Sequence, residues 1–137
     1  MNHHSIRSRR GHKMEEVICD KLNITQTASR GRNACPYDGV DNQGRKVEIK
    51  TIGVHPSNGY PQAGRMAEKK GLCDRLVMEY NGRLFDTASH SDPEYAISQL
   101  LSRRVAQFNP GLKLNNKTTQ LNINTQVLLE CELTETV

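Results

Sequence analysis

The run from residue 37 to residue 51 constrains the fold of this chain more than any other segment. An acid, Asp38, ends one extended stretch, and a tight Asn-Gln-Gly turn follows at 42–44. A second extended stretch then carries Glu48 and Lys50, two residues apart. Alternate residues of a strand project from the same face, so the Glu48 and Lys50 side chains share one face. The run predicts a β-hairpin that brings two carboxylates and an amine together.

Two carboxylates and a lysine in this arrangement favour metal-assisted hydrolysis of a phosphodiester. Asp38 and Glu48 supply the oxygen ligands that Mg²⁺ prefers, and Mn²⁺ accepts the same ligands. Such a cation polarises phosphate and lowers the pKa of a bound water, while Lys50 positions that water and offsets charge on the phosphorus. The backbone carbonyl of Ile49 lies between the two functional side chains and is a further candidate ligand. The alternative interpretation is a hairpin with a solvated charged face.

The pattern of Asp, spacer and Glu-x-Lys resembles the active-site motif of the PD-(D/E)xK nuclease superfamily. Further segments resemble the PvuII-like type II restriction endonucleases within it. These segments are residues 11–14, 31–32, 38–44, 48–52 and 59–60, and Asn115 with Asn116 near the end. The resemblance extends over roughly residues 11–87 and, more loosely, 112–130. It implies a homodimer that requires Mg²⁺ and cuts both strands of a short palindromic DNA site.

Two differences limit what the resemblance implies. The family has a longer N-terminal region, which makes much of its dimer interface. Its recognition strand carries a histidine cluster that reads bases, whereas residues 61–65 of this chain contain no histidine. The resemblance therefore extends to the catalytic residues and not to the preferred DNA sequence.

Candidate DNA contacts fall into two groups. Arginine can bind guanine through two hydrogen bonds, and asparagine or glutamine can bind adenine in the same way. The candidates for base readout are Gln62, Arg65, Asn115 and Asn116. Contacts to phosphate orient a duplex without reading its sequence, and the candidates for this role are Lys13, Arg30 and Arg32. The alternatives are charged surface loops and, for the paired asparagines, a plain turn.

Four other polar residues are weighed less strongly. Glu15 and Glu16 are candidates for a supporting carboxylate or a ligand of a second metal, but a charged helix face is favoured. Asp41 is predicted to cap the bend at 42–44. His55 is favoured as an exposed loop histidine over a proton shuttle or phosphate contact.

The cysteines indicate a reducing compartment. Cys19, Cys35, Cys73 and Cys131 form no Cys-x-x-Cys pair and stand at no zinc-like spacing from the histidines. Buried free thiols are favoured, with a structural zinc site as the alternative. No apolar stretch approaches the length of a membrane span and no signal peptide is evident, so we expect a cytoplasmic protein.

Length and composition indicate one domain spanning residues 1–137. Aromatic residues make up only 4% of the chain and Trp is absent, so the core must be built from aliphatic side chains. Such a core is modest, and burial across a subunit interface would add to it. The formal charge of +4 suits a polyanionic partner rather than a membrane or a small-molecule substrate.

The expected elements combine helices and short strands. Apolar spacing predicts a helix over residues 12–22, with Met14, Val17 and Ile18 in need of cover. Strands are expected at 47–52, 76–80 and 83–87, the last two joined by Asn81-Gly82. Ser91 or Asp92 is expected to cap a helix from 93 to about 107, and one or two strands are expected over 121–133. The predicted fold is α/β (α+β), with a restriction-endonuclease-like mixed central sheet flanked by helices.

These features predict a Mg²⁺-dependent, double-strand-specific DNA endonuclease of restriction type. One chain of this size presents one metal centre, so cutting both strands in one encounter needs two centres related by a two-fold axis. The helix at 12–22 is the expected homodimer interface. A Holliday-junction resolvase or homing-type nuclease of the same superfamily, or a non-catalytic DNA-binding module, is the alternative.

Overall fold

The structure is a computed structural model, and it describes residues 3–27, 36–54, 61–62, 70–102 and 123–137. The helices are α1 (His3–Leu22), α2 (Pro93–Ser102) and α3 (Ile123–Glu130), with a short 3₁₀ helix, η2 (Thr87–Ser89). Six strands form the main sheet: β1 (Ile24–Gln26), β2 (Gly39–Asp41), β3 (Lys46–Thr51), β6 (Arg75–Tyr80), β7 (Arg83–Asp86) and β8 (Glu132–Thr136). A separate two-stranded ribbon pairs β4 (Gly53–Val54) with β5 (Pro61–Gln62).

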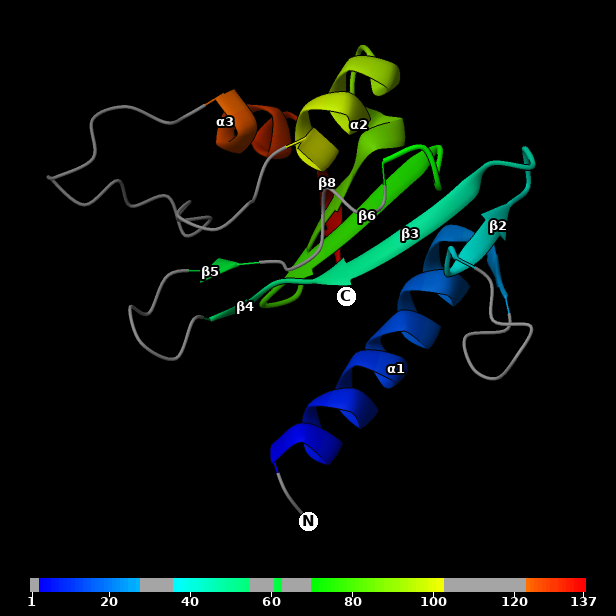
Figure 1. Ribbon diagram of the computed structural model, residues 1–137, viewed down its shortest axis with the longest axis vertical. Helices are drawn as coiled ribbons and strands as arrows, with labels where there is room; N and C mark the ends of the chain where they lie inside the picture. Colours follow the sequence, from blue (N-terminus) through cyan, green and yellow to red (C-terminus); the bar gives the residue numbers. More distant parts are fainter. Residues whose placement is uncertain (1–2, 28–35, 55–60, 63–69, 103–122) are drawn as a thin grey trace, which may run out of the picture.

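The main sheet has the order β1-β2-β3-β6-β7-β8 and mixes two kinds of pairing. β3 and β6 are parallel at its centre, with Ile49 opposite Val77, and the other neighbours are antiparallel. Figure 1 shows α1 on one side of the sheet and α2 with α3 on the other. The expected mixed sheet flanked by helices is confirmed, and the specific likeness to restriction endonucleases stays a prediction.

Two apolar layers hold the helices against the sheet. Ile49 and Val77 pack with Ile18 and Cys19 of α1 on one face. Leu76 and Met78, the residues on either side of Val77 in β6, point to the other face and pack with α2 and α3. Because side chains alternate along a strand, Glu48 and Lys50 project from the face of β3 that lies opposite α1.

Both predicted turns are confirmed. Asn81 and Gly82 join β6 to β7 with φ of 48° and 85°, the left-handed conformation that this pair tolerates. Gly44 adopts φ of 79° in the turn between β2 and β3, and its N–H donates to the Asp41 carbonyl at 3.0 Å. The hairpin that carries the candidate catalytic residues is therefore closed as the sequence predicts.

The N-terminal ends of the two predicted helices differ in their agreement with the sequence. α1 begins at His3, nine residues before the predicted start at residue 12. The first turns lack apolar spacing, so the sequence pattern does not predict them. α2 begins at Pro93 as expected, and Asp92 is its cap, accepting a hydrogen bond from the Tyr95 N–H at 3.1 Å. The part of the expected helix beyond Ser102 lies outside the described residues.

The prediction of strands over 121–133 is wrong for most of that segment. Ile123–Glu130 is helical, and a strand begins only at Glu132. Val127, Leu128 and Cys131 are buried against α2, and this i, i+1, i+4 spacing suits a helix. Short apolar runs do not distinguish a buried helix from a strand, so packing against α2 decides the outcome.

The cysteines within the described residues are buried free thiols, as expected: Cys19, Cys73 and Cys131. Burial raises the pKa of Cys19 and of Cys131 to about 12, with neighbouring carboxylates adding to the effect, so both remain protonated and unreactive. Cys35 lies outside the described residues. None of the helices in the described part has the length and apolar character that a membrane crossing requires.

Candidate active site

The three predicted catalytic residues all lie in or next to the hairpin of β2 and β3. Asp38 directly precedes β2, and its N–H donates to the Val47 carbonyl at 2.8 Å. Glu48 lies in the middle of β3 and is only 4% exposed. Lys50 lies two residues further on, with its Nζ 3.8 Å from Glu48 Oε1. An acid this buried within a sheet is costly unless a cation lies close by.

The edge of β3 beside Asp38 presents main-chain groups to the site. β2 pairs with β3 only as far as Val47, so the next edge position, Ile49, has no partner in β2. The Ile49 N–H donates instead to Asp38 Oδ2 at 2.7 Å. Because the N–H and C=O of one strand residue point to the same edge, the Ile49 carbonyl faces the edge where Asp38 lies. This placement agrees with the expected role of that carbonyl as a ligand.

Glu15 of α1 joins this group from the helical side. It is half-buried, whereas Glu16 is exposed. Burial raises the pKa of Glu15 to about 7, and the nearby Asp38, through its charge and a side-chain hydrogen bond, and Glu48 add to the rise. Glu16 thus lies on an exposed helix face, as favoured for both glutamates, whereas Glu15 is turned partly toward the sheet. Glu15 shares its environment with two predicted metal ligands.

The sequence contains a signal for the inward position of Glu15. Glu15 stands three, four and seven residues before Ile18, Cys19 and Leu22, and these three pack into the core. Residues at such spacing lie on one helix face. An acid in an otherwise apolar helix stripe therefore points toward the sheet rather than into water, and here it meets Asp38.

The donor atoms fit a hard divalent cation. Carboxylates of Asp38, Glu48 and Glu15 and the carbonyl of Ile49 are all oxygen ligands, which suit Mg²⁺ or Mn²⁺ and disfavour zinc. Within the described segments, no three His, Cys, Asp or Glu side chains are gathered closely enough to hold a metal ion. The side chains would therefore have to move closer together to coordinate one.

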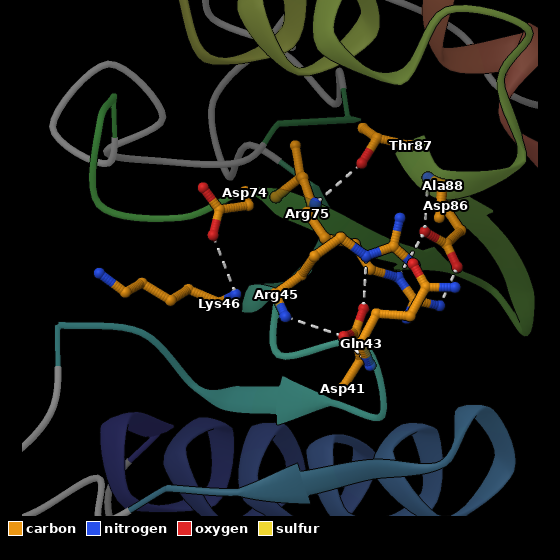
Figure 2. Close-up of polar contacts among 10 residues, drawn as sticks. Asp41, Gln43, Arg45, Lys46, Asp74, Arg75, Asp86, Thr87 and Ala88 are labelled. Atoms are coloured by element: carbon orange, nitrogen blue, oxygen red, sulfur yellow. Dashed lines mark hydrogen bonds and ion pairs between the residues drawn. The ribbon is translucent and has the colours of Figure 1, made fainter.

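A second charged cluster braces the other end of the hairpin (Figure 2). Arg75 on β6 donates to both oxygens of Asp86, at 3.0 and 2.5 Å, and to Asp41 Oδ2 at 3.1 Å. Arg45 Nε lies 2.7 Å from the same Asp41 oxygen. The backbone N–H groups of Gln43 and Arg45 donate to Asp41 Oδ1, each at 2.9 Å. This pattern confirms the predicted capping role of Asp41.

The charges in this second cluster are matched. Burial alone would raise the pKa of Asp41, but hydrogen bonds from Arg45, Arg75 and Gln43 outweigh it and hold that pKa at about 2. Arg75 and Asp86 carried no signal in the sequence, because their partners are distant along the chain. The cluster ties β2, β6 and β7 together and so fixes the hairpin on which Asp38 and Glu48 stand.

Most candidate DNA contacts fall where the structure gives no description. Arg30, Arg32, Arg65, Asn115, Asn116 and His55 lie outside the described residues. Gln62 lies in β5, within the ribbon that continues from β3, and its side chain is not described. Lys13 is exposed on α1. These candidates for base readout and phosphate contact stay predictions.

The surface of α1 changes one premise of the expected dimer. Ile18 is 0% exposed within the single chain, and Met14 packs against the same core cluster, so neither needs cover from a partner. Val17 alone of the three is exposed, at 40%. The premise that all three require a partner is therefore wrong, and the dimer stays a prediction that depends on the two-strand chemistry.

Comparison with known proteins adds no assignment, since no family model, curated protein sequence or solved structure matches the chain. The resemblance to PD-(D/E)xK nucleases accordingly depends on the motif residues and on the hairpin that carries them.

Proposed function

We propose that the protein is a Mg²⁺-dependent endonuclease of the PD-(D/E)xK type that hydrolyses double-stranded DNA. The observation that supports this most strongly is the position of Glu15 beside Asp38, within reach of the Glu48 charge, while Lys50 Nζ lies 3.8 Å from Glu48 Oε1. Burial raises the pKa of Glu15, and the neighbouring carboxylates of Asp38 and Glu48 add to the rise, so ionising all three acids together is unfavourable. A bound divalent cation would relieve that repulsion, and strongly perturbed groups of this kind concentrate at functional sites.

Each residue has a defined task in the proposed reaction. Asp38, Glu48 and the Ile49 carbonyl would hold the metal, and Glu15 would support that set. When bound, the metal polarises the scissile phosphate and acidifies a water. Lys50 directs its ammonium group to the same face as Glu48, where it positions the attacking water and stabilises charge that develops on the phosphate oxygens. The Ile49 N–H holds the Asp38 carboxylate in place.

We further propose that the enzyme is of restriction type and acts as a homodimer. A chain that presents one centre must pair with a second copy to cut both strands, and the two-fold axis then favours a palindromic site. A resolvase of the same superfamily would use the same residues on a four-way junction. A non-catalytic module would bind DNA but would not cleave it.

The test is cleavage of plasmid DNA and of a four-way junction with Mg²⁺, followed by sequencing of the ends. Cuts at one palindromic sequence support the restriction-type proposal, and preferential resolution of the junction would favour the resolvase. Ca²⁺ in place of Mg²⁺ should support binding without turnover. Glu135→Gln serves as a control that removes an exposed acid on β8, far from the site in sequence. Duplex binding without cleavage in either Mg²⁺ or Mn²⁺ would contradict the proposed nuclease and support a non-catalytic DNA-binding module.

A further inference from the structure

The net positive charge of this chain is concentrated at the start of α1. Residues 3–13 contain four of its 19 basic residues and none of its 15 acidic residues. The rest of the chain therefore has 15 of each, and its formal charge is zero. Since the chain as a whole has a formal charge of +4, this one segment accounts for all of it. The four basic residues are Arg7, Arg9, Arg10 and Lys13.

The order of charges along α1 opposes the helix rather than stabilising it. The N-terminal end of a helix carries partial positive charge and favours acids, yet the first turn of α1 contains none. The acids of α1 lie in its second half, at Glu15, Glu16 and Asp20. Arg7 with Arg10, and Arg9 with Lys13, stand at spacings where like charges repel. Local rules of this kind are broken most often where function requires it.

The core contacts described for α1 belong to its second half. Among the α1 residues whose side chains are described, 13–22, the buried side extends from Met14 to Leu22. By helical spacing Arg7 falls on the same stripe as Met14 and Ile18, seven and eleven residues before them. The stripe thus continues toward the N-terminus with arginine in place of an aliphatic residue. Figure 1 shows these first turns extending beyond the sheet and separated from the other elements.

The C-terminal end of this segment lies next to the candidate active site. Glu15, two residues after Lys13, lies beside Asp38. With a rise of about 1.5 Å per residue, Arg7 lies about 12 Å along the helix axis from Glu15. Phosphates of one DNA strand follow each other at about 3.4 Å along the duplex axis. The first turns of α1 would therefore span about three to four nucleotides beyond a phosphate bound at Asp38 and Glu48.

We propose that the first three turns of α1 form an arm that binds the phosphate backbone of duplex DNA flanking the scissile bond. This inference rests on the proposed function, because it places the scissile phosphate at Asp38 and Glu48. Arginine and lysine neutralise phosphates and release counterions, so the arm adds affinity without sequence preference. The absence of an apolar stripe in residues 3–13 disfavours a lipid surface, which requires one.

Binding of a fluorescent duplex in Ca²⁺, measured by anisotropy over a series of salt concentrations, tests the arm. The variant R7A/R9A/R10A should make the slope of log affinity against log salt shallower by about 2.7 per chain. Its affinity at 0.1 M salt should fall on the order of 10²-fold, by the same relation. The variant R7K/R9K/R10K should bind within about threefold of the native chain, because phosphate contact requires charge.

A matched control separates the arm from net charge. S98E/S102E/T134E changes the total charge by the same amount, using exposed positions on α2 and β8, and α2 lies on the face opposite α1. An equal loss of affinity in this control would overturn the inference, as would an unchanged slope in R7A/R9A/R10A or tighter binding of an RNA duplex than of DNA. A native chain that never cleaves DNA but shows arm-dependent binding would overturn the proposed nuclease and support the arm.

Discussion

Asp38 directly precedes β2 and Asp41 ends it, three residues further on, yet their surroundings are opposite. Asp41 meets two arginines, and its pKa falls to about 2. Asp38 lies beside Glu15, whose pKa is raised to about 7 by burial and by the charges of Asp38 and Glu48. The first cluster is complete as the chain folds, because each charge has its counterpart. In the second, Glu15 carries a raised pKa beside Asp38, and Lys50 lies 3.8 Å from Glu48.

This contrast distinguishes a cluster that stabilises the fold from a cluster that is a candidate metal site. A buried pair that is fully matched holds strands in place and gains little from a ligand. A cluster of like charges lowers the stability of the folded protein unless a cation is bound. Such a cluster is therefore a candidate cation-binding site. Variants that affect one cluster and spare the other therefore test whether the two roles are distinct.

The largest effect should come from Asp38→Asn, which removes a metal ligand. We expect DNA cleavage to fall at least about 10³-fold, since both the metal and its bound water lose their position. Stability in metal-free buffer should be unchanged or higher, because one of three repelling carboxylates becomes neutral. Cleavage rate and urea unfolding are measured on the same preparation. Cleavage at the native rate would remove Asp38 from the site.

Arg75→Met should have the opposite profile. It leaves Asp41 and Asp86 without their shared cation, and breaking a buried pair in this way costs about 3–5 kcal/mol. Arg83→Met is the matched control, because Arg83 pairs with Glu132 where both side chains are about a quarter to a third exposed, and its loss should cost at most about 1 kcal/mol. Equal losses in urea unfolding would contradict a special role for the Arg75 cluster.

Lys50→Ala should reduce the cleavage rate about 10²-fold, as expected for one positioned electrostatic group. Duplex affinity in Ca²⁺ should change much less, because Lys50 is assigned to the reaction rather than to the backbone contacts. The two measurements together distinguish a rate effect from a binding effect. A variant whose affinity falls as far as its rate would place Lys50 among the DNA-binding residues.

Glu15→Gln should have the smallest effect, and its dependence on pH identifies it. The pKa of Glu15 rises from 4.5 to about 7 on folding, so the folded chain holds an extra proton between these values and loses stability as pH rises through them. In EDTA the variant should therefore match the native chain below pH 4.5. It should exceed it by about 1–2 kcal/mol at pH 8, a value reduced for partial exposure.

Glu16→Gln, at the exposed neighbouring position, should show no such pH dependence. Added Mg²⁺ should stabilise the native chain more than Glu15→Gln if Glu15 takes part in metal binding. Parallel unfolding curves for both chains at all pH values would show that Glu15 is solvated rather than held beside Asp38.

The parts of the fold that the sequence predicted are those encoded by local rules. Asn81-Gly82 and Gly44 fix their turns through backbone conformation, and the alternation in β3 places Glu48 and Lys50 on one face. Ile123–Glu130 was misassigned because its short apolar run is compatible with either state until α2 covers it. Residues 3–11 were missed as helix because they show no apolar period.

The candidate site followed the same division. Asp38, Glu48 and Lys50 lie close along the chain and could be found from spacing. Glu15 enters from another element, and only its place in the stripe of Ile18 and Leu22 indicated that it faces inward. The Asp41–Arg75–Asp86 cluster joins three strands through charges far apart in sequence, which no local pattern reveals.

The early end of the β2–β3 pairing has a consequence for how this protein should be studied. Two of the groups that shape the candidate site, the N–H and carbonyl of Ile49, belong to the main chain and are retained in every side-chain variant. A mutational scan would record Ile49 as a core residue that tolerates valine and would assign it no catalytic role. An amide-to-ester replacement that removes the Ile49 N–H would expose the contribution, by releasing the Asp38 carboxylate while leaving every side chain intact.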